Sequence, residues 1–369
     1  MNNRERVSAI FHNQPYDRMP VVHFGFWEET LEKWYREGHI TREEWKGWAD
    51  GNEYDRSIGD KLGFDFNWYT CFIPNTGLSP AFETKDVGPY PSGGRMVQNY
   101  DGVIILQKDG AGSIPAEIDH TLKDRESWEN DYKWRFQFDP SRISQTEYEK
   151  IKSVNQGNPI GLHCGSLFGK IRDIMGVEGI SYLYADDEDL YDEIIDTVGD
   201  LCYQTVKYVL DQGWTFDFGH FWEDICYKNG PLVIPDVFDE KVGPWYGKIT
   251  GLLKEHGIEI VSLDCDGLID SLVPTWLDNG VNTMFPIEVG TWGGNIASLR
   301  ASCGSGIRGV GGMNKLVFSQ DRDSIDREIL RLKELAAPGG FIPCPDHRIA
   351  PDATWDNVKY YCERMKEIF

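Results

Sequence analysis

The segment EIVSLDCDG, from Glu259 to Gly267, is a short apolar run that ends on two carboxylates and a thiol. Four other apolar runs also end on residues that can bind a metal or move a proton. They are PIGLHCG (Pro159 to Gly165), FDFGHFWED (Phe216 to Asp224), NTMFPIEVG (Asn282 to Gly290) and GGFIPCPDH (Gly339 to His347). Apolar runs alternating with helix-length segments are typical of buried parallel strands in βα units. Polar chemistry at their C-terminal ends predicts an enzyme-like cup in an α/β protein, a single (β/α)8 TIM barrel.

The N-terminal third predicts an elaboration of this barrel. Residues 2–13 and 28–60 indicate helices, and residues 21–26 and 64–72 indicate the first two strands. Gly/Pro punctuation from about 76 to 120, with alternating segments on both sides of Asp101, predicts a β-hairpin excursion over the barrel mouth. No linker or repeat divides the chain, so we expect one domain spanning residues 1–369.

Composition excludes several classes of partner. The 369 residues carry a formal net charge of −23, which disfavours binding to nucleic acid and to anionic membrane surfaces. The start, MNNRERVSAIF, has no apolar signal region, and no run approaches the ~18 apolar residues of a membrane span. Eight cysteines without a CxxC pair indicate reduced thiols. We therefore expect a cytoplasmic protein.

Two carboxylates and a thiol at one strand end make the first candidate site. Strand alternation places Asp264 and Asp266 on one side and Cys265 on the other. Buried carboxylates are costly unless they face solvent, a cation or a substrate, which predicts catalytic or metal-binding roles. The alternative is a βα loop in which Asp266 caps the next helix.

The last strand ends on Cys344, Pro345, Asp346 and His347, which provide a thiol, a carboxylate and an imidazole within four residues. These ligand types suit zinc, including catalytic sites that keep one position open. The alternative is a hydrogen bond between Asp346 and His347 that stiffens the loop. A metal site and a structural loop are both compatible with this segment.

Histidines and an acid follow other strands. His220 and Glu223 are candidates for general acid–base catalysis, and burial beside Trp222 is expected to raise the pKa of Glu223. His163 and His23 could contribute to a site or pack at their strand ends. The sequence leaves both interpretations open.

Three further residues are candidate ligand contacts. Glu288 follows a strand and could contact a substrate or form an ion pair with Arg300. Asn314 and Lys315 follow a glycine-rich run that could hold a phosphate or carboxylate of a cofactor. The chain has no Walker or dinucleotide-binding motif.

Aromatic residues make up 13% of the chain and gather near the predicted strand ends. Those near strand ends are Phe24, Phe26, Trp27, Trp68, Tyr69, Phe221 and Trp222. An aromatic-lined cavity for a planar, apolar ligand follows as a hypothesis. The predicted substrate-binding set is His23, Phe24, Trp27, Phe221, Trp222 and Glu288.

Several motifs together resemble the uroporphyrinogen decarboxylase superfamily. They are NxRERVxAIFxxxxxDRxPV (3–21), FWEDICYKNGPLVIP (221–235), DxDG (264–267), GVNTMFPIEV (280–289) and GGFIPCPDHRIAPD (339–352). The resemblance spans nearly the whole chain and implies a barrel. The superfamily's decarboxylase carries an RQAGRY-like arginine loop, and this chain has HFGFWE, residues 23–28, in the equivalent region. The chain is therefore more similar to the corrinoid-dependent methyltransferase branch of anaerobic one-carbon metabolism.

The resemblance also implies a metal site. Methyltransferases of that branch hold zinc with a His-x-Cys pair and a cysteine near the final strand. Here the pair corresponds to Asp264 and Asp266, with His347 or Cys344 near the third position, and Cys265 or Glu223 as a further ligand. Such an oxygen-rich site would polarise a methoxyl or phenol oxygen rather than activate a thiol.

The resulting expectation is an O-demethylase-type methyltransferase. It moves a methyl group between a small methoxylated, aromatic donor and the cobalt of a cobalamin-binding partner protein, with a zinc ion as Lewis acid. One alternative is a metal-independent decarboxylase of a carboxylated small molecule. Another is a non-catalytic tetrapyrrole- or corrinoid-binding protein that uses His163, His220 or His347 as a ligand. A homodimer is an arrangement that the sequence leaves open.

Overall fold

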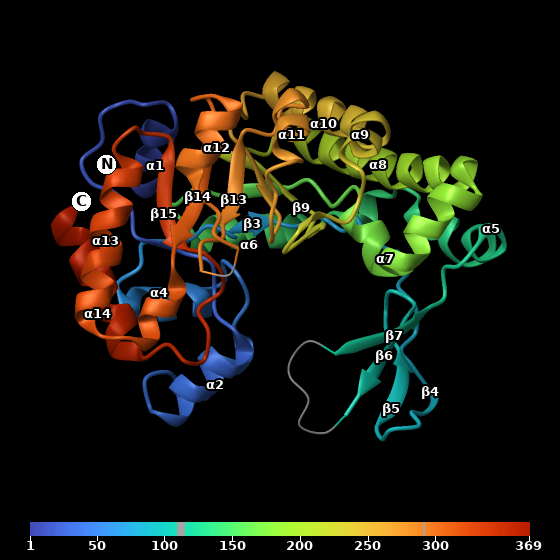
Figure 1. Cartoon of the computed structure of the whole chain (residues 1–369), viewed down its shortest axis with the longest axis horizontal. Coiled ribbons are helices and arrows are strands. Elements are labelled where there is room, and N and C mark those ends of the chain that lie inside the picture. The colour runs from blue at the N-terminus through green and yellow to red at the C-terminus, as the bar shows by residue number, and fades with distance from the viewer. Residues whose placement is uncertain (109–114, 291) are drawn as a thin grey trace.

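A parallel sheet forms the centre of the molecule (Figure 1). The computed structural model describes residues 1–108, 115–290 and 292–369, so residues 109–114 of the predicted excursion lie outside the described part. The sheet has seven strands in the order β15-β14-β13-β12-β9-β8-β3. They are β3 (Cys71–Phe72), β8 (Gly161–His163), β9 (Phe218–Trp222), β12 (Val261–Asp264), β13 (Thr283–Ile287), β14 (Arg308–Met313) and β15 (Phe341–Pro345). This arrangement confirms the predicted α/β class and the five parallel strands of the second half.

Two further strands lie between the ends of this sheet. β1 (Val22–His23) and β2 (Phe66–Asn67) form a separate parallel pair. The chain runs from β2 directly into β3. The β1 and β15 sides lie near each other, and among the described residues an isolated bridge between Phe26 and Ile349 takes the place of a ladder between them. The strand order is therefore that expected of a TIM-like fold, but a continuous ladder of hydrogen bonds does not close the barrel.

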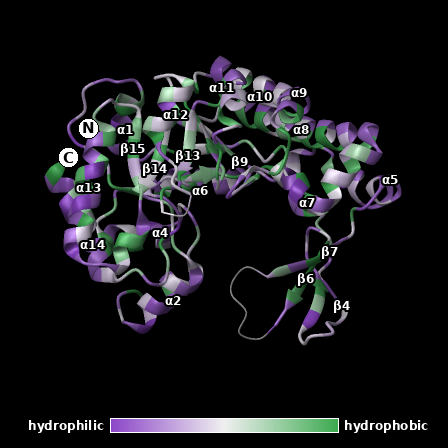
Figure 2. Ribbon diagram, viewed as in Figure 1, coloured by the Kyte–Doolittle hydropathy of each residue, from purple (hydrophilic) through white to green (hydrophobic). Residues whose placement is uncertain are grey.

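Helices surround the sheet, and several bury one face against it (Figure 1). In α13, Ile325, Ile329 and Leu332 are buried at helical spacing, and Figure 2 shows hydrophobic and hydrophilic residues side by side along this helix. The helices are α1 (Asn3–Phe11), α2 (Glu28–Arg36), α3 (Arg42–Gly47), α4 (Glu53–Leu62), α5 (Arg125–Ser127), α6 (Gln145–Val154), α7 (Gly169–Asp186), α8 (Glu188–Asp211), α9 (Pro235–Lys241), α10 (Gly243–Glu255), α11 (Val273–Asp278), α12 (Ile296–Cys303), α13 (Arg322–Ala336) and α14 (Trp355–Ile368). Shorter helical turns are η1 (Trp128–Tyr132), η2 (Lys133–Phe136), η3 (Pro140–Arg142) and η4 (Lys315–Ser319).

A four-stranded antiparallel sheet projects from the parallel sheet, and we call it the arm (Figure 1). It consists of β4 (Lys85–Pro89), β5 (Arg95–Gln98), β6 (Val103–Gln107) and β7 (Ala116–His120), paired in sequence order. The predicted hairpin around Asp101 is confirmed as β5 and β6, in which Arg95 pairs with Gln107. A small antiparallel pair, β10 (Cys226–Tyr227) and β11 (Gly230–Pro231), follows β9.

The inner side of the parallel sheet is filled by large side chains. The indole of Trp68 stacks on Phe218 at 4.6 Å between ring centroids, and its Nε1 donates to the hydroxyl of Ser262 at 3.2 Å. Strand alternation puts Phe218, His220 and Trp222 on this inner side of β9. None of the helices in the described ranges combines the length and apolarity that a membrane crossing requires.

Candidate functional site

Aromatic and polar side chains meet on the inner side of the sheet, near the C-terminal ends of the strands. Phe24 contacts Phe285 edge-on at 4.5 Å between ring centroids and stacks on Tyr69 at 5.8 Å. Tyr69 lies 4.9 Å from the ring of His220. We call this region the cup, lined by Phe24, Tyr69, His163, His220, Asp264, Phe285 and His347. The predicted clustering at the strand ends is therefore observed for part of the candidate set.

His347 lies at the rim of the cup with both ring nitrogens engaged. Nδ1 accepts from the backbone N–H of Arg348 at 2.8 Å, so the ring proton lies on Nε2, which donates to Oδ2 of Asp266 at 3.1 Å. The imidazole also stacks on Trp27, with 5.3 Å between centroids and an interplanar angle of 13°. These contacts fix the orientation and the tautomer of His347.

Arg348 contributes to the wall of the cup, although the sequence did not single it out. Its guanidinium pairs with both carboxylate oxygens of Asp50, at 2.7 Å and 3.2 Å. It lies 5.3 Å from the ring centre of Phe24 and 5.9 Å from that of Tyr69. Its position directly after His347 was the available signal, but its partner is 298 residues away in sequence.

Asp264 differs from the other buried acids of the site. Only 4% of the residue is exposed, and no described residue donates a hydrogen bond to its carboxyl group. Burial raises the pKa of Asp264 well above its usual value, and repulsion from Asp266 adds to the increase. Asp264 is therefore expected to carry a proton near neutral pH.

Glu288 and Trp222 stand at the rim. Burial raises the pKa of Glu288 to about 7, and its carboxylate accepts from the N–H of Gly267 at 3.0 Å. The ion pair with Arg300 is not formed, because Arg300 donates to the carbonyl of Gly339 instead. Trp222 has the guanidinium of Arg172 5.9 Å from its ring centre. Substrate contact by Glu288 and Trp222 stays a prediction.

The lower layer of the cup contains two neutral imidazoles. His163 and His220 are paired residues on β8 and β9, with 5.7 Å between ring centroids. Burial lowers the pKa of His163 to about 4 and that of His220 well below its ordinary value, and His163 adds to the effect on His220. Both rings are consequently uncharged near neutral pH.

The carboxylate of Glu223 is engaged in hydrogen bonds at the start of α7. It accepts from the backbone N–H groups of Leu167 at 2.9 Å, Phe168 at 3.0 Å and Gly169 at the start of α7, and from the Tyr246 hydroxyl. Burial raises its pKa, as the sequence predicted. These contacts are structural, and a catalytic role of Glu223 stays a prediction.

Two predicted substrate contacts face away from the cup. His23 is 1% exposed and packs on Phe64 and Phe26, and its Nδ1 accepts from Gly25 at 3.0 Å. Phe221 is fully buried against Tyr246, with 4.7 Å between ring centroids. Both side chains lie on the outer sides of their strands, so the alternation of β1 and β9 removes them from the site.

The residues predicted to bind zinc do not assemble a site. Cys265 accepts from the N–H of Ile225 at 3.4 Å, and Cys344 is fully buried on the side of β15 that faces α14. Their thiols therefore face away from Asp266 and His347, and the donor nitrogen of His347 is occupied. Within residues 1–108, 115–290 and 292–369, no three His, Cys, Asp or Glu side chains are grouped closely enough to hold a metal ion. The described donor set does not fit zinc.

The glycine-rich run lies within β14 and has a packing role. A Cβ on Gly311, whose φ is +121°, would lie 2.4 Å from the backbone nitrogen of Ile287. Asn314 caps η4 by accepting from Leu316 at 3.1 Å, and the N–H of Lys315 donates to Asp346 at 3.0 Å. The predicted hydrogen bond between Asp346 and His347 is not formed. Cofactor binding by Asn314 and Lys315 is untested, and their observed contacts are structural.

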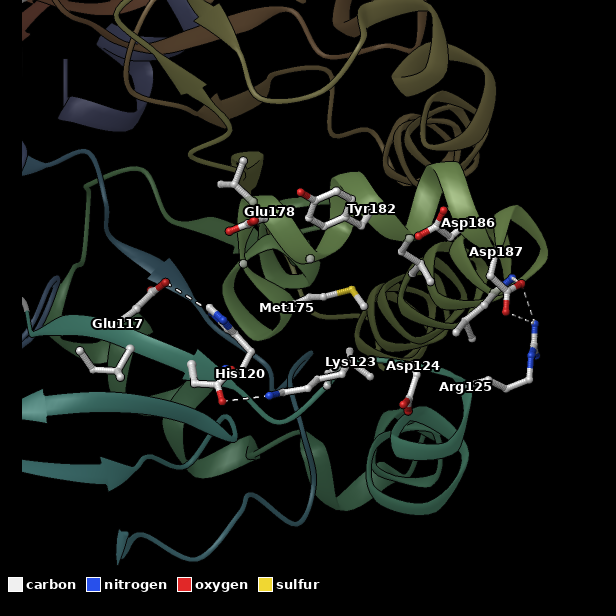
Figure 3. A pocket seen from close by; sticks show the side chains of 18 residues that line it. Glu117, His120, Lys123, Asp124, Arg125, Met175, Glu178, Tyr182, Asp186 and Asp187 are labelled. Carbon is white, nitrogen blue, oxygen red and sulfur yellow. Dashed lines mark hydrogen bonds and ion pairs between the residues drawn. The ribbon is translucent and has the colours of Figure 1, made fainter. Parts of the chain in front are cut away.

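A separate pocket of about 630 Å³ lies where the arm meets α7 and α8 (Figure 3). Its polar side chains pair with one another: Nε2 of His120 lies 3.4 Å from Glu117, and Arg125 donates to Asp187 at 3.2 Å. The residues that line it come from the arm, α7 and the segments beside them, and none of them is a residue of the cup.

Comparisons with known proteins support the fold. No family model matches the chain, and no curated protein matches it. Among solved structures, a methyltransferase from Methanosarcina mazei superposes with a TM-score of 0.62 at 15% identity, over 100% of this chain and 99% of that one. A protein described as a vitamin-B12 independent methionine synthase from Listeria monocytogenes gives a TM-score of 0.44 at 11% identity, covering 96% and 99% of the two chains. The first likeness shows a shared fold, and the second is too low to carry an argument.

Proposed function

We propose that the chain is a corrinoid-dependent methyltransferase of the O-demethylase type. It would move the methyl group of a small methoxylated, aromatic donor to the cobalt of a cobalamin-binding partner protein. The observation that carries this proposal is Asp264, a buried carboxyl group without a hydrogen-bonding partner among the described residues, which faces an aromatic cup. The fold that the chain shares with a methyltransferase is compatible with this activity.

Cleavage of an aryl methyl ether requires an acid. The bond between the methyl carbon and the ether oxygen breaks, its electron pair stays on the oxygen, and the resulting phenolate needs a proton or a positive charge. A carboxyl group whose pKa is raised by burial can donate that proton near neutral pH. We assign this donation to Asp264, in place of the predicted Lewis acid. A cobalamin-binding partner would supply the nucleophile for the methyl carbon, its cobalt in the reduced state.

The remaining residues of the cup position the donor. Phe24, Tyr69 and Phe285 surround the inner end of the cup and provide faces and edges for an aromatic ring. The pair formed by Asp266 and His347 holds the rim in one arrangement, and the charge of Asp266 favours the protonated form of Asp264. The donor's methyl group would face the open end, because the cobalt must reach that carbon directly.

The decarboxylase alternative requires cationic side chains that hold substrate carboxylates. Arg348 is the guanidinium in the wall of the cup, and Asp50 already occupies two of its donors. The charge of Asp266, at the rim of the cup, would repel a carboxylated ligand. Methyl transfer from an uncharged ether is therefore the function that we favour.

The test is methyl transfer from methoxyarenes to cobalamin reduced to the Co(I) state, followed by absorbance. We expect Asp264→Asn to slow the reaction by about 10²- to 10⁴-fold, because the amide has no acidic proton. The rate of the parent protein should fall as pH rises through the raised pKa of Asp264, since only the protonated form donates. The variant should lack this dependence on pH.

Asp278→Asn is the matched control, because Asp278 is an exposed aspartate at the end of α11. Its rate should equal that of the parent protein. Two results would contradict the proposal: no transfer from any methoxyarene by the parent protein, or an Asp264→Asn rate equal to the parent rate.

A further inference from the structure

The lower layer of the cup has hydrogen-bonding capacity that the proposed acid step does not use. His220 is fully buried, and neither ring nitrogen has a hydrogen-bonding partner among the described residues. Its neighbours are the rings of Tyr69, His163 and Phe285, at 4.9, 5.7 and 5.9 Å between centroids. Buried polar atoms in native proteins almost always have partners, so this layer is suited to a polar ligand group.

His163 adds a donor of known direction. Its Nδ1 accepts from the N–H of Gly165 at 3.1 Å, so the ring proton lies on Nε2, to which no described residue is hydrogen-bonded. The hydroxyl of Tyr69 is likewise free of hydrogen bonds from the described part of the chain. We call His163, His220 and Tyr69 the floor triad.

The charge of the floor triad limits the ligand chemistry. Both imidazoles are uncharged near neutral pH, because burial lowers their pKa values, and the phenol of Tyr69 is also neutral because burial raises its pKa. Neutral N–H and O–H donors match an uncharged oxygen acceptor. A carboxylate or phosphate would enter a buried site without a compensating positive charge, which is unfavourable.

The strand register sets the distance between the floor triad and Asp264. His220 is paired with Ser262, and Asp264 lies two residues further along β12, level with Trp222. Two residues of strand correspond to about 6.6 Å. That separation is comparable to the span between the two oxygens of a para-disubstituted ring, so one ring could reach both levels.

We propose that the floor triad is a subsite for an uncharged hydroxyl or carbonyl oxygen at the end of the donor opposite its methoxyl group. This inference rests on the proposed function, because that reaction points the methyl group toward the open end of the cup. The substrate class is then a methoxylated aromatic ring with an oxygen substituent in the para position. The floor triad determines specificity, and Asp264 serves the bond cleavage.

The experiment compares two donors of nearly equal shape, 4-methoxyphenol and 4-methoxytoluene. Calorimetric titration into the unaltered protein requires neither cobalamin nor a variant. We expect 4-methoxyphenol to bind about 10- to 100-fold more tightly, because 4-methoxytoluene leaves the triad's polar groups unpaired. Equal affinity for the two compounds, or binding of neither, would overturn the proposed subsite.

Variants test whether the floor triad causes the preference for 4-methoxyphenol. His163→Phe and His220→Phe should each reduce the preference for the hydroxyl compound to less than about threefold, whereas Phe24→Leu should weaken binding of both compounds alike. Thermal unfolding identifies any variant that does not fold, and the half-buried His163 is the safer substitution if His220→Phe fails. A preference that survives in a folded His163→Phe protein would exclude His163 from the subsite.

The two experiments distinguish a failure of the proposed function from a failure of the proposed subsite. A strong preference for 4-methoxyphenol without methyl transfer to Co(I) cobalamin would support the subsite and contradict the demethylase activity. Transfer at equal efficiency from both compounds would support the activity and contradict the subsite.

Discussion

Two buried carboxylates accept hydrogen bonds from the backbone of loops near the C-terminal ends of the strands. Glu223 receives three backbone N–H groups at the start of α7. Asp346 receives those of Val289 and Gly290, at 3.0 Å and 2.7 Å, and that of Lys315. Each carboxylate connects the ends of neighbouring βα units. In sequence they resemble Asp264, and their partners alone distinguish their roles.

At the residue scale, we predict that Glu223→Gln reduces the free energy of unfolding by about 1–3 kcal/mol. The amide replaces one acceptor oxygen with an N–H donor that faces backbone donors. Urea denaturation followed by tryptophan fluorescence measures the change. Methyl transfer per folded molecule should stay within about twofold of the parent rate, since Glu223 does not line the cup.

Glu334→Gln is the control for this substitution, because Glu334 is exposed on α13. It should change the unfolding free energy by less than about 0.5 kcal/mol. A Glu223→Gln protein that has the stability of the parent but no activity would instead support a catalytic role of Glu223.

At the scale of elements, α7 is interrupted where the arm packs on it. Gly176 has φ +74° and ψ 158° inside the helix, and the ring of His120 at the end of β7 lies against it. A Cβ at this position would be 2.6 Å from Cε1 of His120. The pocket in Figure 3 lies at the same junction, and Met175, Glu178 and Tyr182 line it. The base of the arm therefore packs against α7 at this kink.

We predict that Gly176→Ala loosens this junction at a cost of about 1–3 kcal/mol, because the side chain is strained at positive φ and collides with His120. Limited proteolysis should cut the arm faster in the variant while the parallel sheet remains intact. Gly251→Ala is the matched control, since Gly251 lies in α10 with open space around its position. That substitution should stabilise the protein by about 0.4–1 kcal/mol. An arm that is cut at the parent rate in Gly176→Ala would contradict the junction.

At the scale of the whole molecule, buried titratable groups link stability to pH. Burial raises the pKa of Asp55 and of Glu288 to about 7, so between about pH 4 and pH 7 the native state holds protons that the unfolded chain has lost. The unfolding free energy contributed by these groups therefore falls as pH rises. Burial lowers the pKa values of His23, His163 and His220, which has the opposite effect. The histidines therefore make the unfolding free energy rise with pH, and this rise fades above the ordinary imidazole pKa of about 6.5.

We accordingly predict that the unfolding free energy decreases from about pH 7 to about pH 8, where the two carboxyl groups lose the rest of their native-state protons and the imidazole contribution has nearly ended. Urea denaturation at half-unit steps of pH measures this slope. Asp55→Asn should make the slope of unfolding free energy against pH shallower, because one titrating carboxyl group is lost. The exposed Asp278→Asn should not change this slope. Stability that rises through this interval would contradict the assignment of raised pKa values to these carboxyl groups.

Much of the fold was predictable from local patterns. The apolar runs and their helical intervals predicted the parallel strands of the second half, since burial on both faces requires continuous apolar residues. Alternation also separated Asp264 from Cys265, whose side chains lie on opposite sides of β12. The open ladder between β1 and β15 was not predictable, because it depends on how two distant segments meet.

The candidate site was predictable from the sequence only in part. Phe24, His220 and Asp264 were predicted, because residues at the C-terminal ends of neighbouring parallel strands meet at one edge. The predicted zinc ligands do not come together among the described residues, since the thiols of Cys265 and Cys344 face away from Asp266 and His347. Sequence spacing cannot reveal which distant side chain engages a predicted ligand, as Asp266 does for His347.

The sequence by itself determined the order of strands and helices, the acidic character of the surface and the set of polar residues at the strand ends. These follow from period, composition and spacing, which are local properties of the chain. Only the tertiary structure decided which of those residues are engaged. Arg348 is paired with Asp50, and His347 with Asp266, whereas Asp264 and His220 have no partner among the described residues. Hydrogen-bond partners and burial are set by segments that are far apart in sequence and close in space, so they exist only in the folded chain.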